Sequence, residues 1–304
     1  MLELMKDVEK YIALHQTMGF KFKQQSYQLR NFAIFATERG ESMVTSQSAV
    51  DWAKEAPSPC SRTERLRFVR RFATSMAAEN PIYEIPPKIN FGQVQRRQPH
   101  IFTAKEISQI LNAAWALNPK DSIRPRTYVT LFALLAATGL RISEALALEF
   151  DDVTENGLVI RKTKFRKSRL IPLHITVKNA LNRYLEVRIK VPGSSPSVFV
   201  SLEGKRIAYS TVVCNFLQIV RQHGVHPGVG QSGPRIHDFR HTFAVRSLED
   251  CPRDRGKIRR HIHALSTYLG HAHVTDTYWY LQATPHLLRN ISESAEAFAP
   301  RGKT

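Results

Sequence analysis

Cysteine is scarce in this 304-residue chain, which contains only Cys60, Cys214 and Cys251. Three widely spaced cysteines cannot form the disulfide framework of a small secreted domain. Their scarcity is typical of proteins that fold in a reducing compartment, so we expect a cytoplasmic protein. Hydrophobic residues make up 42% of the chain, which is enough to build sizeable cores without disulfides.

Long apolar stretches are also lacking. The longest mainly apolar run, from Tyr128 to Leu140, is too short to cross a bilayer. The first residues, MLELMKDVEKYIALH, are interrupted by charges and do not form the apolar segment of a signal peptide. We therefore expect no membrane partner.

Acidic charge is the third shortage. Only 26 Asp and Glu oppose 44 Lys and Arg, which gives a formal net charge of +18, and most of the excess lies after residue 90. Clustered cations gain affinity for a polyanion by displacing the counterions of its phosphates. The composition favours a nucleic-acid partner over a generally basic soluble protein.

Residues 1–80 show helical periodicity alone. Apolar side chains recur at helical spacing in four segments; the third is Ser46–Lys54, with Ser46 as its expected cap, and the fourth runs from about Ser61 to Ala78. Opposite its apolar face the fourth helix carries Arg62, Arg65, Arg67, Arg70 and Arg71. This face could simply be solvated, but in a basic protein we favour contact with a DNA backbone.

Helix-breaking prolines divide the chain. Pro86, Pro87 and Pro99 border a segment that also contains Arg96 and Arg97. We expect a helical domain over residues 1–85, an extended basic linker over 86–99, and a larger domain over 100–304 with a C-terminal tail from about 285. The two arginines add candidate DNA contacts within the linker.

The larger domain mixes helices with a few short strands. Thr103 and Glu106 form a capping-box pattern, and Arg141 follows a Thr-Gly-Leu turn to begin a further helix. Strand-like runs at Leu158–Lys162 and Leu170–Leu173 flank a turn in which six of the nine residues from Arg161 to Arg169 are basic. Further expected elements are a helix over Tyr128–Ala137, a helix over Val177–Ile189, a short strand over Val198–Val200 and a helix over Ser210–His223. The predicted fold class is mainly α with a small antiparallel β-sheet (α+β).

Arginine, histidine and tyrosine recur in a pattern that suits phosphate chemistry. A planar guanidinium can neutralise two phosphate oxygens at once, and Arg141 and Arg240 are the candidates for a two-sided clamp. A tyrosine has a pKa of about 10 and needs a positive environment or a base to become a nucleophile. A lysine of the basic turn could protonate the leaving oxygen, with His237 assisting proton transfer. Tyr278 and Tyr280 point about 200° apart on a helix, and spacing alone does not choose between them.

Histidines near the C-terminal end raise a metal alternative. Zinc could bind among Cys251, His261, His263, His271 and His273, but their spacing matches no familiar ligand pattern and no second cysteine pair is present. His237 and His241 lie four apart without the glutamate of a helical metalloprotease site. We expect no metal.

Four segments together resemble the tyrosine recombinases, the lambda-integrase family of site-specific DNA recombinases. They read ATGLRISEALAL, TKFRKSRLIPL, HDFRHTFA and LGHAHVTDTYWY, in the family's order. The resemblance covers nearly the whole chain and implies a helical core-binding domain followed by a catalytic domain.

The resemblance implies roles for individual residues. Arg141 and Arg240 match the two catalytic arginines, Glu144 the acidic residue that orients the site, and His237 the histidine of His-x-x-Arg. The later His/Trp position corresponds to His271, and the family spacing selects Tyr280 as the nucleophile. Lys164 is the expected general acid, with Lys162 and Lys167 as rivals because the usual glycines are missing from the turn. The remaining expected DNA contacts are Arg62, Arg65, Arg70, Arg96, Arg97, Arg166, Lys167 and Arg169.

The implied reaction forms a 3′-phosphotyrosyl bond at Tyr280 and needs neither ATP, a metal nor another cofactor. The implied partner is double-stranded DNA with a specific recombination site, bound by a homotetramer or with sibling recombinases of a mobile element, in the bacterial cytoplasm and nucleoid. A DNA-relaxing enzyme of type IB, a non-cleaving DNA-binding accessory protein and a metal-dependent nuclease are the alternatives. The segment between Arg240 and His271 is longer than usual for the family and contains DCPRDRGKIRRH. It could be a DNA contact, a partner surface or a disordered loop.

Overall fold

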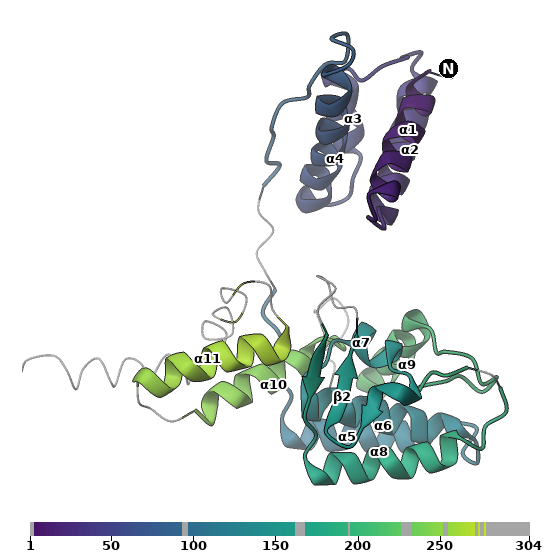
Figure 1. Ribbon diagram of the computed structural model, residues 1–304, viewed down its shortest axis with the longest axis vertical. Helices are drawn as coiled ribbons and strands as arrows, with labels where there is room; N and C mark the ends of the chain where they lie inside the picture. The colour runs from purple at the N-terminus through teal and green to yellow at the C-terminus, as the bar shows by residue number, and fades with distance from the viewer. Residues whose placement is uncertain are drawn as a thin grey trace, which may run out of the picture. The chain divides into compact units, whose positions relative to one another are not determined.

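The computed structural model describes residues 3–92, 97–161, 168–193, 195–225, 233–251, 255–270, 273 and 277. The chain separates into two compact units, Met1–Arg97 and Gln98–Thr304. The expectation of a mainly helical protein with a small antiparallel sheet is confirmed (Figure 1). Within the described residues, no helix is both long and apolar enough to span a membrane.

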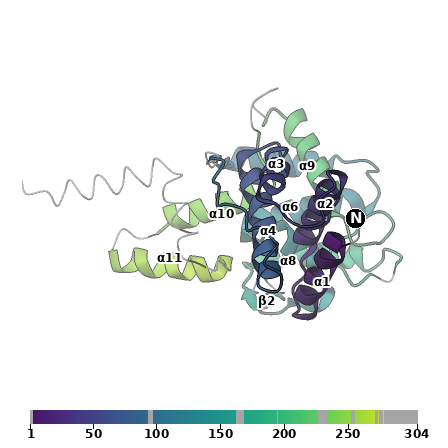
Figure 2. The ribbon, with the colours of Figure 1, turned by 90° about the horizontal axis from the view of Figure 1, so that it is seen from above.

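The first unit is built from four helices around one core. They are α1 (Glu3–Thr17), α2 (Lys23–Glu38), α3 (Ser46–Lys54) and α4 (Pro59–Ala77). Helix α1 packs against α2, and α3 packs against α4 (Figure 2). Apolar residues at helical spacing on α1 and α4, such as Leu4, Val8, Val69 and Phe72, are fully buried in this core.

Two helix starts in this unit follow capping chemistry. The Thr45 hydroxyl accepts a hydrogen bond from the Ser48 N–H, so Thr45 caps α3. The prediction of Ser46 as the cap is therefore wrong by one residue, because Ser46 is already the first helical residue. The Ser58 hydroxyl caps α4 by accepting a hydrogen bond from the Ser61 N–H. Pro59 follows as the first helical residue, where the missing N–H costs nothing because it would have no partner within the helix.

The chain that follows α4 packs against the first unit as far as Phe91. The Tyr83 hydroxyl donates to Asp7 at 2.6 Å, and Arg70 donates to the carbonyl of Pro86. Ile89 and Phe91 pack against the core of the four helices. Much of the segment expected as a linker thus belongs to the surface of this unit, while 93–96 lie outside the described residues.

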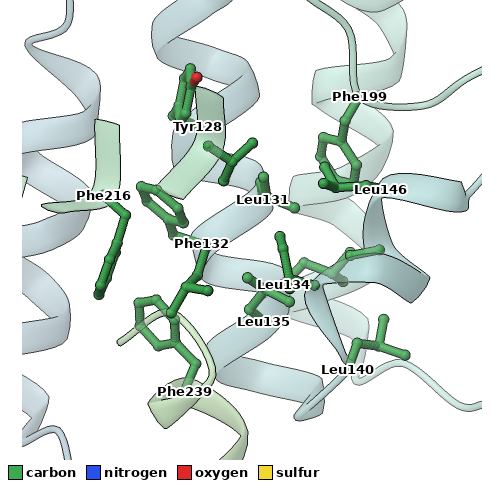
Figure 3. Close-up of a cluster of buried hydrophobic side chains, with 14 of the residues drawn as sticks. Tyr128, Leu131, Phe132, Leu134, Leu135, Leu140, Leu146, Phe199, Phe216 and Phe239 are labelled. Carbon is green, nitrogen blue, oxygen red and sulfur yellow. The ribbon is translucent and has the colours of Figure 1, made fainter. Parts of the chain in front are cut away.

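The second unit has its largest core around α6 (Ile123–Thr138). Helices α5 (Ala104–Trp115) and α8 (Ile175–Arg188) pack against it, and α9 (Tyr209–Gln222) contacts α5. Figure 3 shows Phe132, Phe216 and Phe239 converging from three elements, with leucines of α6 beside them. The expected capping box is confirmed, because Thr103 and Glu106 exchange side-chain hydrogen bonds with each other's backbone N–H.

A three-stranded antiparallel sheet, ordered β1-β2-β3, lies next to this core. Its strands are β1 (Val153–Thr154), β2 (Gly157–Ile160) and β3 (Arg169–Ile171), and Leu158 pairs with Ile171. The hairpin prediction is confirmed for β2 and β3, and the two-residue β1 was not foreseen. The segment Val198–Val200 forms only isolated bridges on either side, from Ser197 to Glu149 and from Val200 to Arg206, and not the expected strand.

Helices α10 (Asp238–Glu249) and α11 (Arg255–Leu269) form a pair that is seen side by side in both views (Figure 1, Figure 2). Ala244, Val245 and Leu248 of α10 pack against Ile262 and Leu265 of α11 in a small core of their own. The residues from Arg255 onward are helical, so the interpretation of this part of the insert as a disordered loop is wrong. Between the helices, 252–254 lie outside the described residues.

Candidate active site

Arg141 begins α7 (Ile142–Ala147) directly after the turn that ends α6. Gly139 ends α6 in the left-handed conformation, with φ of +60°. A Cβ added at Gly139 would lie 2.6 Å from the Phe243 ring, so both the backbone angle and the space require glycine. This turn therefore fixes the position of Arg141 relative to the end of α6.

Glu144 holds Arg141 in two ways. The backbone N–H of Arg141 donates to Glu144 Oε2 at 3.0 Å, and its Nη1 donates to Oε1 at 2.9 Å. The carboxylate thus fixes both the start of the helix and the direction of the guanidinium. Glu144 thus fixes the orientation of Arg141 through its side chain and its backbone.

Arg240 reaches the same place from α10. The residue is only 2% exposed, and its guanidinium donates to the Gly139 carbonyl at 2.9 Å and to the Leu269 carbonyl at 2.6 Å. Burying a guanidinium is costly unless its N–H groups are satisfied. Two backbone carbonyls satisfy part of this need for Arg240.

The two arginines converge on the C-terminal end of α11. Leu269 O accepts from Arg240 and also from Arg141 Nη1 at 3.3 Å, and Gly270 O accepts from Arg141 Nη2 at 3.1 Å. The carbonyls that end a helix lack intrahelical partners and carry partial negative charge, so cations are stabilised there. One helix end thus gathers two positive charges from distant parts of the chain.

Arg169 of β3 completes the cluster. Its two terminal nitrogens donate to Glu144 at 3.0 and 2.8 Å, and its Nε donates to the Tyr268 carbonyl at 2.9 Å. Burial raises the pKa of Glu144, but the hydrogen bonds and charges of Arg169 and Arg141 outweigh it and hold the pKa below its ordinary value. Glu144 is therefore an ionised carboxylate between two guanidinium groups.

His237 lies at the first turn of α10 and keeps access to solvent. Enclosure of the ring by the surrounding protein lowers its pKa, and the positive charges of Arg240, Arg141 and Arg235 lower it further, to about 4. The imidazole is therefore neutral at physiological pH and can accept a proton. Its ring meets that of His241 edge to face, with centroids 4.8 Å apart.

The structure therefore brings together four of the predicted site residues: Arg141, Glu144, His237 and Arg240. Lys164, His271 and Tyr280 lie outside the described residues, as do Lys162, Tyr278 and the candidate DNA contacts Arg96, Arg166 and Lys167. In the sequence, His271 directly follows Gly270, whose carbonyl accepts from Arg141.

The candidate DNA contacts on α4 are anchored within their own unit. Arg62 donates to the Ala56 carbonyl, and Arg65 donates to the Trp52 carbonyl while lying over the indole ring, 4.7 Å from its centroid. An open groove of about 440 Å³ is lined by basic side chains of α4 and the chain beyond it, namely Arg67, Arg70, Arg71 and Lys88. The basic face of α4 therefore forms one side of an open groove. Arg97, the remaining described candidate, lies where the first unit ends.

One of the expected DNA contacts is corrected by the structure. The side chain of Arg169 is only 13% exposed, and its guanidinium is engaged by Glu144 and the Tyr268 carbonyl. Its place at the end of a basic turn suggested DNA contact, and no local pattern indicated a buried carboxylate as its partner. The carbonyls of Leu269 and Gly270 were missed for the same reason, because backbone acceptors leave no mark in a sequence.

The zinc alternative gains no support from the described residues. Among them, no group of three His, Cys, Asp or Glu side chains is arranged to hold a metal ion. His261 instead lies 3.1 Å from the Ser247 hydroxyl, across the pair of α10 and α11.

Comparisons with known proteins identify the family of the chain. Residues 100–286 match the phage integrase family. The chain is 35% identical to the integrase/recombinase y4rB of Sinorhizobium fredii, over 95% of this chain and 96% of that protein. It is 30% identical to the tyrosine recombinase XerD of Mycobacterium leprae, over 68% of this chain and 63% of that protein.

Solved structures share the fold at lower identity. The Tn1549 transposon integrase, in complex with transposon right end DNA, has a TM-score of 0.65 and 17% identity, over 95% of this chain and 99% of that one. A lambda integrase dimer bound to a core site has a TM-score of 0.61 and 16% identity, over 91% of this chain and 76% of that one. The chain belongs to the phage integrase family of tyrosine recombinases, enzymes that cleave and rejoin DNA strands in site-specific recombination.

Proposed function

We propose that this protein is a site-specific DNA recombinase that cleaves each strand through a 3′-phosphotyrosyl intermediate at Tyr280. The observation that carries the proposal is the joint anchoring of Arg141 and Arg240 at the Leu269 and Gly270 carbonyls, next in sequence to His271. Two guanidinium groups fixed in advance can neutralise the charge that develops on a phosphate under attack.

The remaining residues supply the proton transfers. The Tyr280 oxygen attacks the scissile phosphorus, and neutral His237 takes the phenolic proton, directly or through the phosphate. The bond from phosphorus to the 5′ oxygen breaks, and Lys164 protonates that oxygen. In the second step a 5′-hydroxyl of the partner strand attacks the phosphotyrosyl bond and releases Tyr280. Bond energy is kept in the protein–DNA linkage, so the reaction uses neither ATP nor a metal.

DNA is held by both units in this proposal. The groove of α4 with Arg67, Arg70, Arg71 and Lys88 binds the backbone, since lysine and arginine contacts to phosphates position a protein without reading bases. The helical first unit then serves as the core-binding domain. Four protomers, or a hetero-assembly with sibling recombinases, act on the recombination sites of a bacterial mobile element in the cytoplasm. The DNA complexes of the Tn1549 and lambda integrases support the duplex as the partner.

The test uses suicide duplexes, nicked close to the cleavage point and tiled across the DNA that flanks the gene. The native protein should form a covalent complex on one of them, in EDTA and without ATP. Tyr280→Phe should abolish the complex, and Tyr278→Phe should retain it. A complex that survives in Tyr280→Phe would show that the nucleophile is another residue, and loss of activity in EDTA would favour a metal-dependent nuclease.

A further inference from the structure

We propose that Arg169 is a positioning residue for strand cleavage, which neutralises Glu144 so that Arg141 keeps its positive charge for the DNA phosphate. This inference rests on the proposed function of the site. Arg169 would touch neither the DNA nor the nucleophile, and would act entirely through the carboxylate it holds.

The geometry places Glu144 between two guanidinium groups. Its Oε1 accepts from Arg141 at 2.9 Å and from Arg169 at 3.0 Å, and its Oε2 accepts from the Arg141 backbone at 3.0 Å and from Arg169 at 2.8 Å. Four bonds use the whole accepting capacity of a carboxylate. Arg169 takes two of them in the parallel arrangement that is strongest for this pair.

The net charge of these three side chains shows why Arg169 matters. Arg141, Arg169 and Glu144 together carry one net positive charge, and the side chain of Glu144 is only 10% exposed. Without Arg169, the buried carboxylate would have Arg141 as its nearest cation and would close on it. Arg141 and Glu144 would then form an ion pair with no net charge. The attraction of Arg141 for a phosphate would fall.

An arginine is needed for this task because it must bridge two elements. While its terminal nitrogens hold Glu144, its Nε donates to the Tyr268 carbonyl. A Cβ added at Gly270 would lie 2.8 Å from Arg169 Nη1, so the guanidinium lies flat against that glycine. A lysine has one nitrogen and no fork, so it could neutralise the carboxylate but not join it to α11.

The same hairpin offers a matched control. Arg161, just beyond the end of β2, forms an ion pair with Asp152 at 2.5 Å, and its side chain is 55% exposed. This pair resembles Arg169 and Glu144 in chemistry but involves neither Arg141 nor α11. Arg161→Met therefore removes an arginine–carboxylate pair from the hairpin without touching the site.

The experiment measures the single-turnover rate of covalent complex formation on a suicide duplex at saturating protein. Arg169→Met should slow this rate by about 10- to 100-fold, the range expected when one hydrogen bond to a charged group is lost. The dissociation constant for DNA should change by less than about threefold, because binding is spread over many phosphates. Arg169→Lys should be intermediate, and Arg161→Met should cleave like the native protein.

The decisive variant is the double change Glu144→Gln with Arg169→Met. Removing the carboxylate charge releases Arg141, so the double variant should cleave faster than Arg169→Met alone. A role limited to folding predicts the opposite, since a second core change would slow the reaction further. The thermal unfolding temperature of each variant measures any loss of stability separately from the cleavage rate.

Native cleavage by Arg169→Met would overturn the proposal, and so would a double variant no faster than the single one. Failure of the proposed function is recognised independently. In that case the native protein itself forms no covalent complex, or Tyr280→Phe still forms it.

Discussion

The arginines of the two units are held in contrasting ways. On α4 of the first unit, the side chain of Arg67 is 54% exposed and pairs with Glu64 at the surface. In the second unit Arg240 is 2% exposed and is held by two backbone carbonyls. The first kind of arginine can adapt to a partner, whereas the second is fixed before any partner arrives.

This difference separates binding from catalysis. Exposed cations add their contributions to DNA affinity one at a time and are screened by salt. A cation held in place by the protein needs no reorganisation when charge develops on the reacting phosphate, which is why such groups have large effects on rate. The two kinds of arginine should therefore respond differently to substitution.

The largest effect is expected from Arg240→Ala. Loss of a fixed cation at the phosphate should lower the rate of covalent complex formation by about 10²–10³-fold, the size seen when a preorganised donor is removed. DNA affinity should change little. The rate is measured in a single turnover on a suicide duplex, and Arg67→Ala serves as the control. Equal rate losses in the two variants would remove the distinction between the units.

Gly139→Ala should give the next largest effect, on stability. The left-handed backbone and the Phe243 ring together should lower the free energy of unfolding by about 2–4 kcal/mol. Gly40 of the first unit has φ of +79° but nothing within 4 Å of an added Cβ, so Gly40→Ala should cost only about 1–2 kcal/mol. Denaturant unfolding followed by circular dichroism compares them. A larger loss at Gly40 would contradict the packing argument.

The titration of His237 tests the electrostatics of the second unit. Its NMR signals should titrate at a pKa of about 4, below the ordinary 6.5, and this pKa should rise when a duplex supplies phosphate charge nearby. Because the pKa is lowered in the folded state, the associated stability is present above pH 6.5 and is lost as the pH falls towards 4. A normal pKa for His237 would mean that the ring is less enclosed by protein, or the arginines farther from it, than in this structure.

The smallest effect is expected on α4. Arg71→Ala should reduce the slope of log affinity against log salt concentration by about 0.9 if Arg71 contacts one phosphate. The cleavage rate at saturating protein should not change. Arg30→Ala on α2 is the matched control, because Arg30 is an exposed arginine paired with Glu9 in the same unit. An unchanged slope in Arg71→Ala would mean that DNA does not follow this groove.

Local features were predictable from the sequence because their causes lie within a few residues. The capping box of Thr103 and Glu106, the turn at Gly139, the β2–β3 hairpin and the apolar stripes of α1 and α4 all depend on short-range spacing. The site residues Arg141, Glu144, His237 and Arg240 came from motif order, and the structure brings these four together.

Partnerships between distant segments were decided by the tertiary structure alone. Nothing beside Arg169 in the sequence indicates that it turns inward to Glu144, or that the last carbonyls of α11 receive Arg141 and Arg240. These bonds form because burying a guanidinium or a carboxylate is unfavourable until each has a partner. Charge and periodicity determined that the chain is helical, basic and suited to phosphate; only packing decided which arginines meet the solvent and which are held inside.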